Sequence, residues 1–492
     1  MNNQISRLAV ASLVLVIALI VGTTYWQAWA APGLADRRDN AIKVVAQFTI
    51  KRGAIFAADG SVLARNRPKR VNGQTFYYRR YPGRGRFAHP VGYSTQARSR
   101  AGIEESRNDY LTGANTNLAT LLDTTLNRIR GATIKGNDLM LTLRPRAQKV
   151  AMEALAGQCG AAVALEPKTG KVLVMASSPS YDPNLIEKNF KAAQRAHGPC
   201  PVAPLLNRAS GGLFIPGSTF KIVTAAAALD TGTYTPDSTF NDPGYCVEYG
   251  KRVNNYDTST PFGTINFGQA FQHSVNSAFC EMGKKLGPEK ILDYARRFGF
   301  YERPPIDLPD GERVPSGLYS KGRPLPRSEE RRADPGRLAF GQERMLVTPL
   351  QMAMVAGAIA NKGVVMKPYL TDRVRKPDKS ILVKFKPEEL DRAVKPQTAA
   401  EISSMMESVV SGGTGTAGAI PSVRVAGKTG TAETGVSGRN TTWFVSFAPV
   451  DNPKVAIALV LQNQSGTGGS NSAPLVKQIM EALLRSPSNS KG

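Results

Sequence analysis

Residues 155–485 of this 492-residue chain predict an α+β fold built on one antiparallel sheet. Strand-like apolar runs occur near both ends of this segment, whereas runs with helical periodicity fill residues 215–360 between them. The strand-like runs are residues 160–165, 172–176, 425–432, 442–448 and 455–462. Strands from the two ends of one domain can pair in a single sheet against which helices pack. We therefore expect a sheet closed by the terminal segments, with a helical insert.

The first element along the chain is an uncharged apolar run from Leu8 to Trp26. As a helix with a rise of about 1.5 Å per residue, this run is long enough to cross the hydrocarbon core of a bilayer. Arg7 precedes it and Trp29 follows it as an interfacial aromatic residue. We expect an uncleaved signal anchor at 8–26 behind a cytoplasmic tail at 1–7, in a single-pass protein whose body lies outside the membrane. Ala28-Trp29-Ala30 also fits a signal-peptide cleavage site, so removal of this segment is the alternative.

Residues 40–145 predict a small, irregular, β-rich domain between the anchor and the sheet domain. Residues 40–65 have the pattern of two strands around the turn Asp59-Gly60. Residues 66–135 are rich in Arg and Gly, contain few long periodic runs and indicate an exposed module. The remaining elements are a strand at 138–143, a helix from Pro145 to about Ala156, a last helix at 473–484 and a polar tail at 486–492.

The chain is strongly basic, and its charge is unevenly distributed. The formal net charge is +25, and residues 51–150 contain 19 Lys and Arg residues against 6 Asp and Glu residues. A basic surface of this kind attracts nucleic acid, anionic lipid or acidic polymers. Because we expect the body of the protein to be exported, we expect no nucleic-acid partner. The membrane surface and acidic wall polymers both stay open as partners of the basic module.

The histidine and cysteine contents restrict the chemistry. With 3 histidines, the chain has little material for a multi-histidine metal site, so we expect no metal, no cofactor and a catalytic base other than histidine. Four cysteines fit an oxidising compartment with up to two disulfides, and their spacing leaves all three pairings open. The cysteines are Cys159, Cys200, Cys246 and Cys280.

A Ser–Lys pair can replace histidine in nucleophilic catalysis, and the chain contains such a pair at a predicted helix start. Ser218 and Lys221 are separated by three positions, so their side chains are neighbours on one helix face. Gly217 lets the chain turn before the helix, whose first N–H groups are free. A desolvated lysine beside another cation has a lowered pKa and can accept the serine proton.

Two further patterns that follow Ser-x-x-Lys in a fixed order support its interpretation as a catalytic motif. Single copies are common by chance: Ser488 and Lys491 repeat Ser-x-x-Lys, Ser106-Arg107-Asn108 repeats Ser-x-Asn, and Lys168-Thr169-Gly170 repeats Lys-Thr-Gly. Only one set of copies places Ser-x-x-Lys, Ser-x-Asn and Lys-Thr-Gly in this order within a single domain. Its members are Ser218 and Lys221, then Ser274 and Asn276, then Lys428, Thr429 and Gly430 followed by Thr431.

This ordered triple resembles the penicilloyl serine transferase superfamily, and further segments are similar to class B penicillin-binding proteins. Residues 204–209 and 348–353 look like the segments before the catalytic serine and after the helical insert of their transpeptidase domains. Residues 52–55 and 102–104 look like parts of their N-terminal pedestal domain. The short actinobacterial type called penicillin-binding protein A is most similar. The resemblance implies a five-stranded antiparallel sheet packed with helices, an all-helical subdomain, a dimerisation-like pedestal at 40–145 and a transpeptidase domain at 155–485.

The resemblance also implies a role for each residue of the triple. Ser218 would attack the D-Ala-D-Ala carbonyl of a peptidoglycan stem peptide, and Lys221 would take its proton. Ser274 would relay a proton to the leaving D-Ala. The substrate-binding residues would be Asn276, Lys428, Thr429, Gly430 and Thr431. Asn276 would hold the donor amide, Lys428 would supply positive charge, and Thr429 would bind the terminal carboxylate. The N–H groups of Thr431 and Ser218 would form the oxyanion hole.

The implied enzyme is a serine D,D-transpeptidase in the bacterial cell membrane with an extracytoplasmic catalytic domain. Its partners would be stem peptides, β-lactams and a membrane-embedded glycan polymerase of the shape, elongation or division type. The alternatives are a D,D-carboxypeptidase or β-lactamase, and a non-catalytic β-lactam sensor or scaffold. A β-lactamase needs a carboxylate that activates water. We interpret Glu312, which lies 36 residues after Asn276, as part of a solvated turn.

Overall fold

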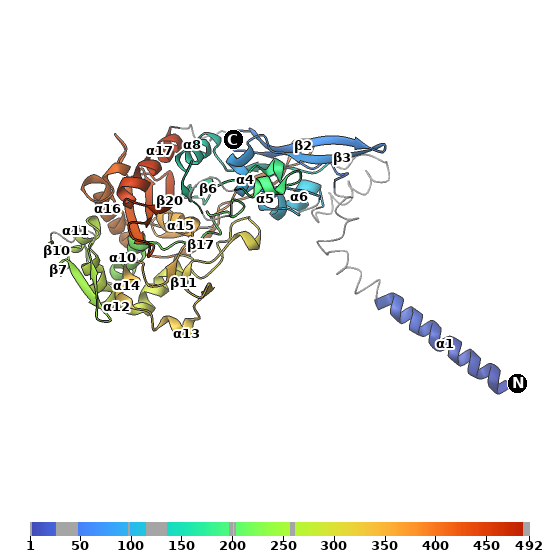
Figure 1. Ribbon diagram of the computed structural model, residues 1–492, viewed down its shortest axis with the longest axis horizontal. Helices are drawn as coiled ribbons and strands as arrows, with labels where there is room; N and C mark the ends of the chain where they lie inside the picture. Colours follow the sequence, from blue (N-terminus) through green and yellow to red (C-terminus); the bar gives the residue numbers. More distant parts are fainter. Residues whose placement is uncertain are drawn as a thin grey trace.

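The computed structural model describes residues 2–25, 48–96, 99–114, 135–195, 200, 203–255 and 261–485 (Figure 1). Helix α1 (Asn2–Thr24) contains an apolar window, Gln4–Thr24, that is long enough to cross a membrane. The rest of the described chain does not cover its apolar side chains. Within the described residues it is the one helix of this length and composition, as the sequence predicts. The predicted cytoplasmic tail forms the first turns of the same helix.

The central sheet confirms the predicted α+β class. It is antiparallel and five-stranded, and strands from both ends of the domain meet in it. In spatial order the strands are β18 (Ala426–Glu433), β19 (Asn440–Ala448), β20 (Val455–Gln464), β5 (Cys159–Leu165) and β6 (Val172–Ser178). The two middle strands, β20 and β5, are therefore far apart in the sequence, and β18 forms one edge.

Both faces of this sheet are buried. Successive residues of a strand point to opposite faces, and consecutive positions of these strands carry apolar side chains. Trp443 and Val445 of β19 belong to one core with helix α15 (Pro349–Ala360), while Phe444 belongs to a second core on the opposite face. That opposite face is covered by α8 (Pro145–Ala154) and α17 (Ala473–Leu484). Continuous apolar strands of this kind need helices on both sides.

The helical region lies beside the edge strand β18 and contains α10 (Lys221–Asp230), α11 (Phe267–Gln272), α12 (Asn276–Arg297) and α16 (Pro396–Gly412). A run of helical periodicity extends from Phe267 to Leu286, and the structure divides it into α11 and α12. The helix breaks at Ser274, whose φ of 60° lies in the left-handed region. Short antiparallel pairs also occur here, β7 (Thr239–Asp242) with β10 (Gly263–Asn266) and β8 (Tyr245–Glu248) with β9 (Lys251–Asn254).

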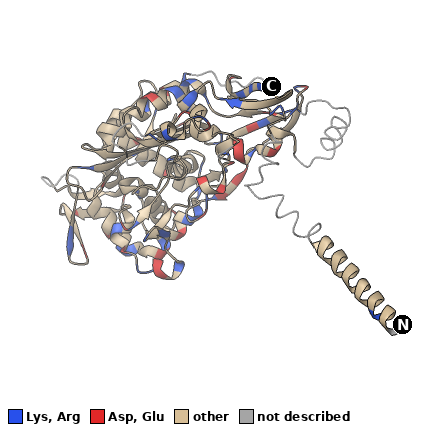
Figure 2. Ribbon diagram, turned by 45° about the vertical axis from the view of Figure 1, so that its right-hand side comes forward, with Lys and Arg blue, Asp and Glu red and all other residues tan. Residues whose placement is uncertain are grey.

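A second, six-stranded sheet contains the strands predicted for the N-terminal domain. Its order is β16 (Ile381–Lys384), β15 (Thr371–Arg375), β4 (Asp138–Leu141), β1 (Ile55–Phe56), β2 (Val62–Val71) and β3 (Gln74–Arg80). Two of its strands therefore come from residues 371–384. The β2–β3 hairpin forms a long arm with exposed Arg and Lys side chains (Figure 2). The predicted irregular module is thus more regular than its composition indicates.

A buried charge cluster holds the N-terminal segments of this sheet together. Glu104 is fully buried and accepts hydrogen bonds from Nε of Arg52 at 2.8 Å and Nε of Arg79 at 2.6 Å. Burial alone would raise the pKa of Glu104, but the two guanidinium groups outweigh burial and lower it. The Arg-Gly and Gly-Ile-Glu segments that resemble a pedestal domain therefore meet at one ion cluster.

Glu312 contacts the N-terminal domain, which corrects its interpretation as part of a solvated turn. It belongs to the short helix η5 (Asp310–Glu312) and is half-buried. Its carboxylate accepts a 2.8 Å hydrogen bond from N of Gly102 in helix α5 (Gly102–Ser106). Burial raises its pKa to about 7. The side chain therefore contacts the N-terminal domain, where Arg107 and Asp307 also form an ion pair at 3.1 Å.

The four cysteines form two disulfides, which settles the pairing that their spacing leaves open. Cys159 of β5 is bonded to Cys200, and Cys246 of β8 is bonded to Cys280 of α12. The first links the central sheet to the segment before the serine helix. The second links the β8–β9 hairpin to the helix that begins at Asn276.

Candidate active site

The turn that carries Ser218 is packed tightly against the edge strand β18. The short helix η4 (Gly217–Phe220) leads directly into α10, and Ser218 is half-buried. Gly217 has a φ of 51°, and a Cβ placed there would lie 3.0 Å from the carbonyl oxygen of Thr431. A Cβ at Gly430 would lie 2.8 Å from the carbonyl oxygen of Pro216. Glycine at both positions therefore lets the backbones of the serine turn and β18 approach each other.

Lys221 is fully buried at the start of α10 and contacts the Ser-x-Asn residues. Its Nζ donates to the carbonyl oxygen of Ser274 at 2.8 Å and to Oδ1 of Asn276 at 2.8 Å. Oγ of Ser274 lies 3.2 Å away. The left-handed backbone at Ser274 places both its carbonyl and its hydroxyl oxygen near the amine, which a continuous helix would not do.

Lys428 lies in β18 on the other side of Ser274 and is also fully buried. Its Nζ donates to Oγ of Ser274 at 2.9 Å and to the carbonyl oxygen of Thr429 at 3.2 Å. The Ser274 hydroxyl therefore lies between two buried amines. The hydroxyls of Thr429 and Thr414 are 2.6 Å apart, and Oγ1 of Thr431 accepts from N of Gly468 at 3.1 Å.

The two lysines are buried without compensating charge. Among the residues that the structure describes, neither ammonium forms an ion pair with a carboxylate. Burial, together with the positive charge of Lys428, holds the pKa of Lys221 well below its usual range. Burial lowers the pKa of Lys428 to about 7. A buried lysine of this kind is a candidate base, because desolvation favours the neutral amine.

The structure brings all eight predicted site residues to one place, and it separates them from the second copies of the motifs. Ser106 and Asn108 lie in the N-terminal domain, Lys168 lies in the exposed β5–β6 turn, and Ser488 and Lys491 lie outside the described residues. Three residues near the site were not predicted. These are Thr414, which contacts Thr429, and Asn255 and Asp242, which lie behind Asn276. No pattern in the sequence marks these three polar residues.

Two protein families match the chain. The family described as "Penicillin binding protein transpeptidase domain" matches residues 160–481, which contain the serine turn, the Ser274 turn and β18. The family described as "Penicillin binding protein A dimerisation domain" matches residues 52–139, which contain the Arg52–Glu104–Arg79 cluster.

Relatives and solved structures agree with these matches. The chain is 35% identical over 99% of both chains to "Peptidoglycan D,D-transpeptidase PbpA" of Mycolicibacterium smegmatis, and 34% identical, again over 99% of both, to the protein of that name in Mycobacterium tuberculosis. The structure of penicillin-binding protein A from M. tuberculosis as a ceftriaxone acyl-enzyme complex superposes with a TM-score of 0.79 at 31% identity, covering 90% of this chain and 100% of that one. The chain therefore belongs to the penicillin-binding protein transpeptidase family.

Proposed function

We propose that this protein is a serine D,D-transpeptidase that crosslinks peptidoglycan stem peptides through an acyl-enzyme on Ser218 and is acylated by β-lactams. The observation that supports it best is the Ser274 hydroxyl between two buried lysines, one of which begins the helix of Ser218. Relatives named peptidoglycan D,D-transpeptidases and neighbours described as penicillin G and imipenem acyl-enzyme complexes support the same reaction.

In the acylation step, Oγ of Ser218 attacks the carbonyl carbon of the penultimate D-Ala while neutral Lys221 takes the hydroxyl proton. A neutral amine has two N–H groups, and the two 2.8 Å bonds to Ser274 and Asn276 can use both, which leaves the lone pair for that proton. The N–H groups of Ser218 and Thr431 stabilise the oxyanion, since the serine turn packs directly on β18.

Collapse of the tetrahedral intermediate breaks the bond to the terminal D-Ala, whose nitrogen needs a proton. The Ser274 hydroxyl supplies it and recovers one from protonated Lys221, because it lies within 3.2 Å of that amine. Lys428 in its charged form and the hydroxyl of Thr429 bind the terminal carboxylate. An amine of a second stem peptide then attacks the ester, releases Ser218 and forms the crosslink.

A transpeptidase must pass its acyl group to an amine faster than to water. Glu312, the carboxylate considered for water activation, contacts the N-terminal domain through Gly102. We therefore expect a thioester analogue of the acyl-D-Ala donor, mixed with a D-amino acid, to give mainly the aminolysis product. Mass spectrometry of the products measures this partition, and the β-lactam adduct on Ser218 should persist for many minutes. Rapid hydrolysis of both compounds would instead identify a carboxypeptidase or β-lactamase.

The two lysines predict a bell-shaped pH dependence of acylation in the free enzyme. Activity needs neutral Lys221 and charged Lys428. It should fall at low pH as Lys221 is protonated, and fall again above about pH 7 as Lys428 loses its proton. The second-order rate constant of labelling by a fluorescent penicillin, measured from about pH 5 to about pH 10, tests this profile. In Lys428→Arg, residue 428 keeps its charge at high pH, so the fall in the rate constant should shift to a higher pH. If the fall stays at the same pH, it reports the titration of another group.

The membrane anchor and the polymerase partner belong to the same proposal. The apolar helix α1 near the N-terminus supports a single-pass protein with its catalytic domain outside the bacterial membrane. Protease treatment of intact, wall-stripped cells should remove the domain, and full protection would contradict this orientation. For a membrane-embedded glycan polymerase, we expect copurification in detergent that depends on residues 1–145.

A further inference from the structure

The helix that begins at Asn276 has no cap from its own chain segment. Val275 precedes it and offers no side-chain acceptor to the first N–H groups of α12. The backbone N–H groups of Asn276 and Ser277 both donate to Oδ1 of Asn255, at 2.9 and 3.1 Å. Asn255, which is 5% exposed, therefore caps this helix from a different segment.

Asp242 fixes the orientation of the Asn255 amide. Nδ2 of Asn255 donates to both carboxylate oxygens of Asp242, at 2.9 and 3.0 Å. Asp242 is 1% exposed and also accepts from the N–H groups of Gly244 and Phe262 and from the hydroxyl of Ser277. Because an ionised carboxylate cannot donate, the nitrogen of the Asn255 amide must face Asp242 and its oxygen must face α12.

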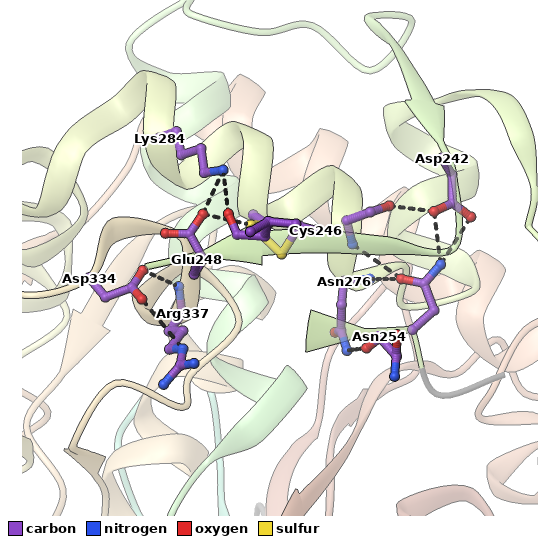
Figure 3. Close-up of a disulfide and its surroundings, with 12 residues drawn as sticks. Asp242, Cys246, Glu248, Asn254, Asn276, Lys284, Asp334 and Arg337 are labelled. Atoms are coloured by element: carbon purple, nitrogen blue, oxygen red, sulfur yellow. Dashed lines mark hydrogen bonds and ion pairs between the residues drawn. A yellow bond between two sulfur atoms is a disulfide. The ribbon is translucent and has the colours of Figure 1, made fainter. Parts of the chain in front are cut away.

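The same segment orients the side chain of Asn276. Nδ2 of Asn276 donates to the carbonyl oxygen of Asn254 at 3.0 Å, so its Oδ1 faces Lys221 and accepts from Nζ at 2.8 Å. Asn255 therefore holds the backbone of Asn276, and Asn254 holds its side chain. Figure 3 shows the contact between Asn254 and Asn276. Any movement of this pair displaces an acceptor of the Lys221 amine.

The hairpin before Asn255 is attached to α12 at two further points, spaced by successive helical turns. Cys246 is bonded to Cys280, and Glu248 forms a 2.7 Å ion pair with Lys284 (Figure 3). Residues 276, 280 and 284 lie about one turn apart on one helix face. The β8–β9 hairpin is therefore fastened along α12, with Asn255 at the end nearest the lysines.

We propose that Asn255, oriented by Asp242, is a positioning residue for acylation. It holds the first turn of α12, and thereby Asn276 and the amine of Lys221, in the arrangement that accepts the proton of Ser218. The inference rests on the proposed function. Neither residue belongs to the three motifs, and each acts through Asn276 rather than on the substrate.

The central test is a charge exchange between residues 242 and 255. Asn255→Ala removes the cap and should lower the acylation rate constant for a fluorescent penicillin about 10- to 100-fold, since small displacements of catalytic groups have effects of this size. Asn255→Asp sets two carboxylates against each other and should lower the rate at least as much. Adding Asp242→Asn returns a donor to the pair, although the Nδ2 that faces residue 255 can no longer accept from N of Phe262. The double variant should therefore recover part of the loss and react at least about fivefold faster than Asn255→Asp, as expected for coupled neighbours.

Arg252→Ala is the matched control on the same hairpin. It removes the packing of the guanidinium on Tyr245 and its hydrogen bond to the side chain of Asn254, but no contact to Asn276. We expect acylation within about threefold of wild type and little change in melting temperature, because Arg252 is exposed. A general weakening of the hairpin would slow Arg252→Ala and Asn255→Ala alike, and would overturn the positioning role.

Amide hydrogen exchange of residues 274–282 separates this inference from the proposed function. Exchange should quicken in Asn255→Ala and return towards wild type in the double variant, whether or not the protein reacts with penicillin. Unchanged exchange, wild-type acylation of Asn255→Ala, or no recovery in the double variant would each overturn the inference. If Asn255→Ala or Asn255→Asp does not fold, the double variant decides. An unreactive wild-type protein would instead contradict the proposed function.

Discussion

Ser218→Ala will abolish covalent labelling by a fluorescent penicillin and leave thermal unfolding close to that of wild type. The substitution removes the proposed nucleophile, and loss of a nucleophile lowers the rate by about 10³-fold or more. The serine is half-buried and the change removes a single oxygen, so the core around Phe220 and Trp443 is unaffected. Gel fluorescence measures the labelling, and intact mass measures whether one adduct forms.

The second Ser-x-x-Lys copy in the chain supplies the control. Ser488→Ala changes the same residue type in the polar tail and should be labelled at the wild-type rate. Labelling of Ser218→Ala at that rate would assign the nucleophile to another residue. Peptide mapping of the wild-type adduct would then locate it.

The site could be predicted from the sequence because its residues are few, chemically specific and ordered. Ser218, Ser274 and Lys428 each occur in a pattern with a chance copy elsewhere, and their order in one domain selects the set. The strands of the central sheet could also be predicted from the sequence. They are buried on both faces, so they occur as continuous apolar runs, which differ from the periodic pattern of amphipathic helices. Edge strand β18 was predicted at 425–432 and extends from Ala426 to Glu433.

The features that escaped prediction depend on contacts between distant segments or on single backbone angles. The sequence places Ser274 in a loop or at a helix start, but nothing in the pattern reveals the left-handed backbone that turns its hydroxyl towards Lys221. Asn255 and Asp242 are single polar residues outside the three motifs, and their role emerges only when α12 is placed against them. The disulfide between Cys246 and Cys280 needs the same packing before it can be chosen among three pairings.

Two strands of the N-terminal sheet, β15 and β16, could not be predicted as part of it for a related reason. Strand β15 pairs with β4, for example through Val374 and Leu139, although 235 residues separate these two positions, and β16 pairs with β15. A boundary drawn on composition, such as the predicted limits 40–145, cannot include strands supplied so far along the chain. The contacts of Glu312 with Gly102 and of Asp307 with Arg107 also join residues from the two sides of the predicted boundary.

Lys221→Met will lower the acylation rate constant about 10²- to 10⁴-fold, the range that general-base catalysis contributes. Methionine fills a similar volume but has no lone pair for the Ser218 proton. The residual reaction should lose the acidic limb of the pH profile, because that limb reports protonation of Lys221. Lys221→Arg should be equally slow, since a guanidinium keeps its proton throughout this range. Stopped-flow labelling across pH measures both variants.

A matched control is Lys168→Met, which changes the exposed lysine of the second Lys-Thr-Gly copy and should react like wild type. The informative comparison is with Lys428→Met. If Lys428 were the base, its loss would remove the acidic limb and Lys221→Met would keep it. The structure favours the opposite result, because Lys221 begins the helix that Ser218 precedes, whereas Lys428 reaches the site through the hydroxyl of Ser274. Retention of the acidic limb in Lys221→Met would therefore transfer the base to Lys428 and leave Ser218 as the nucleophile.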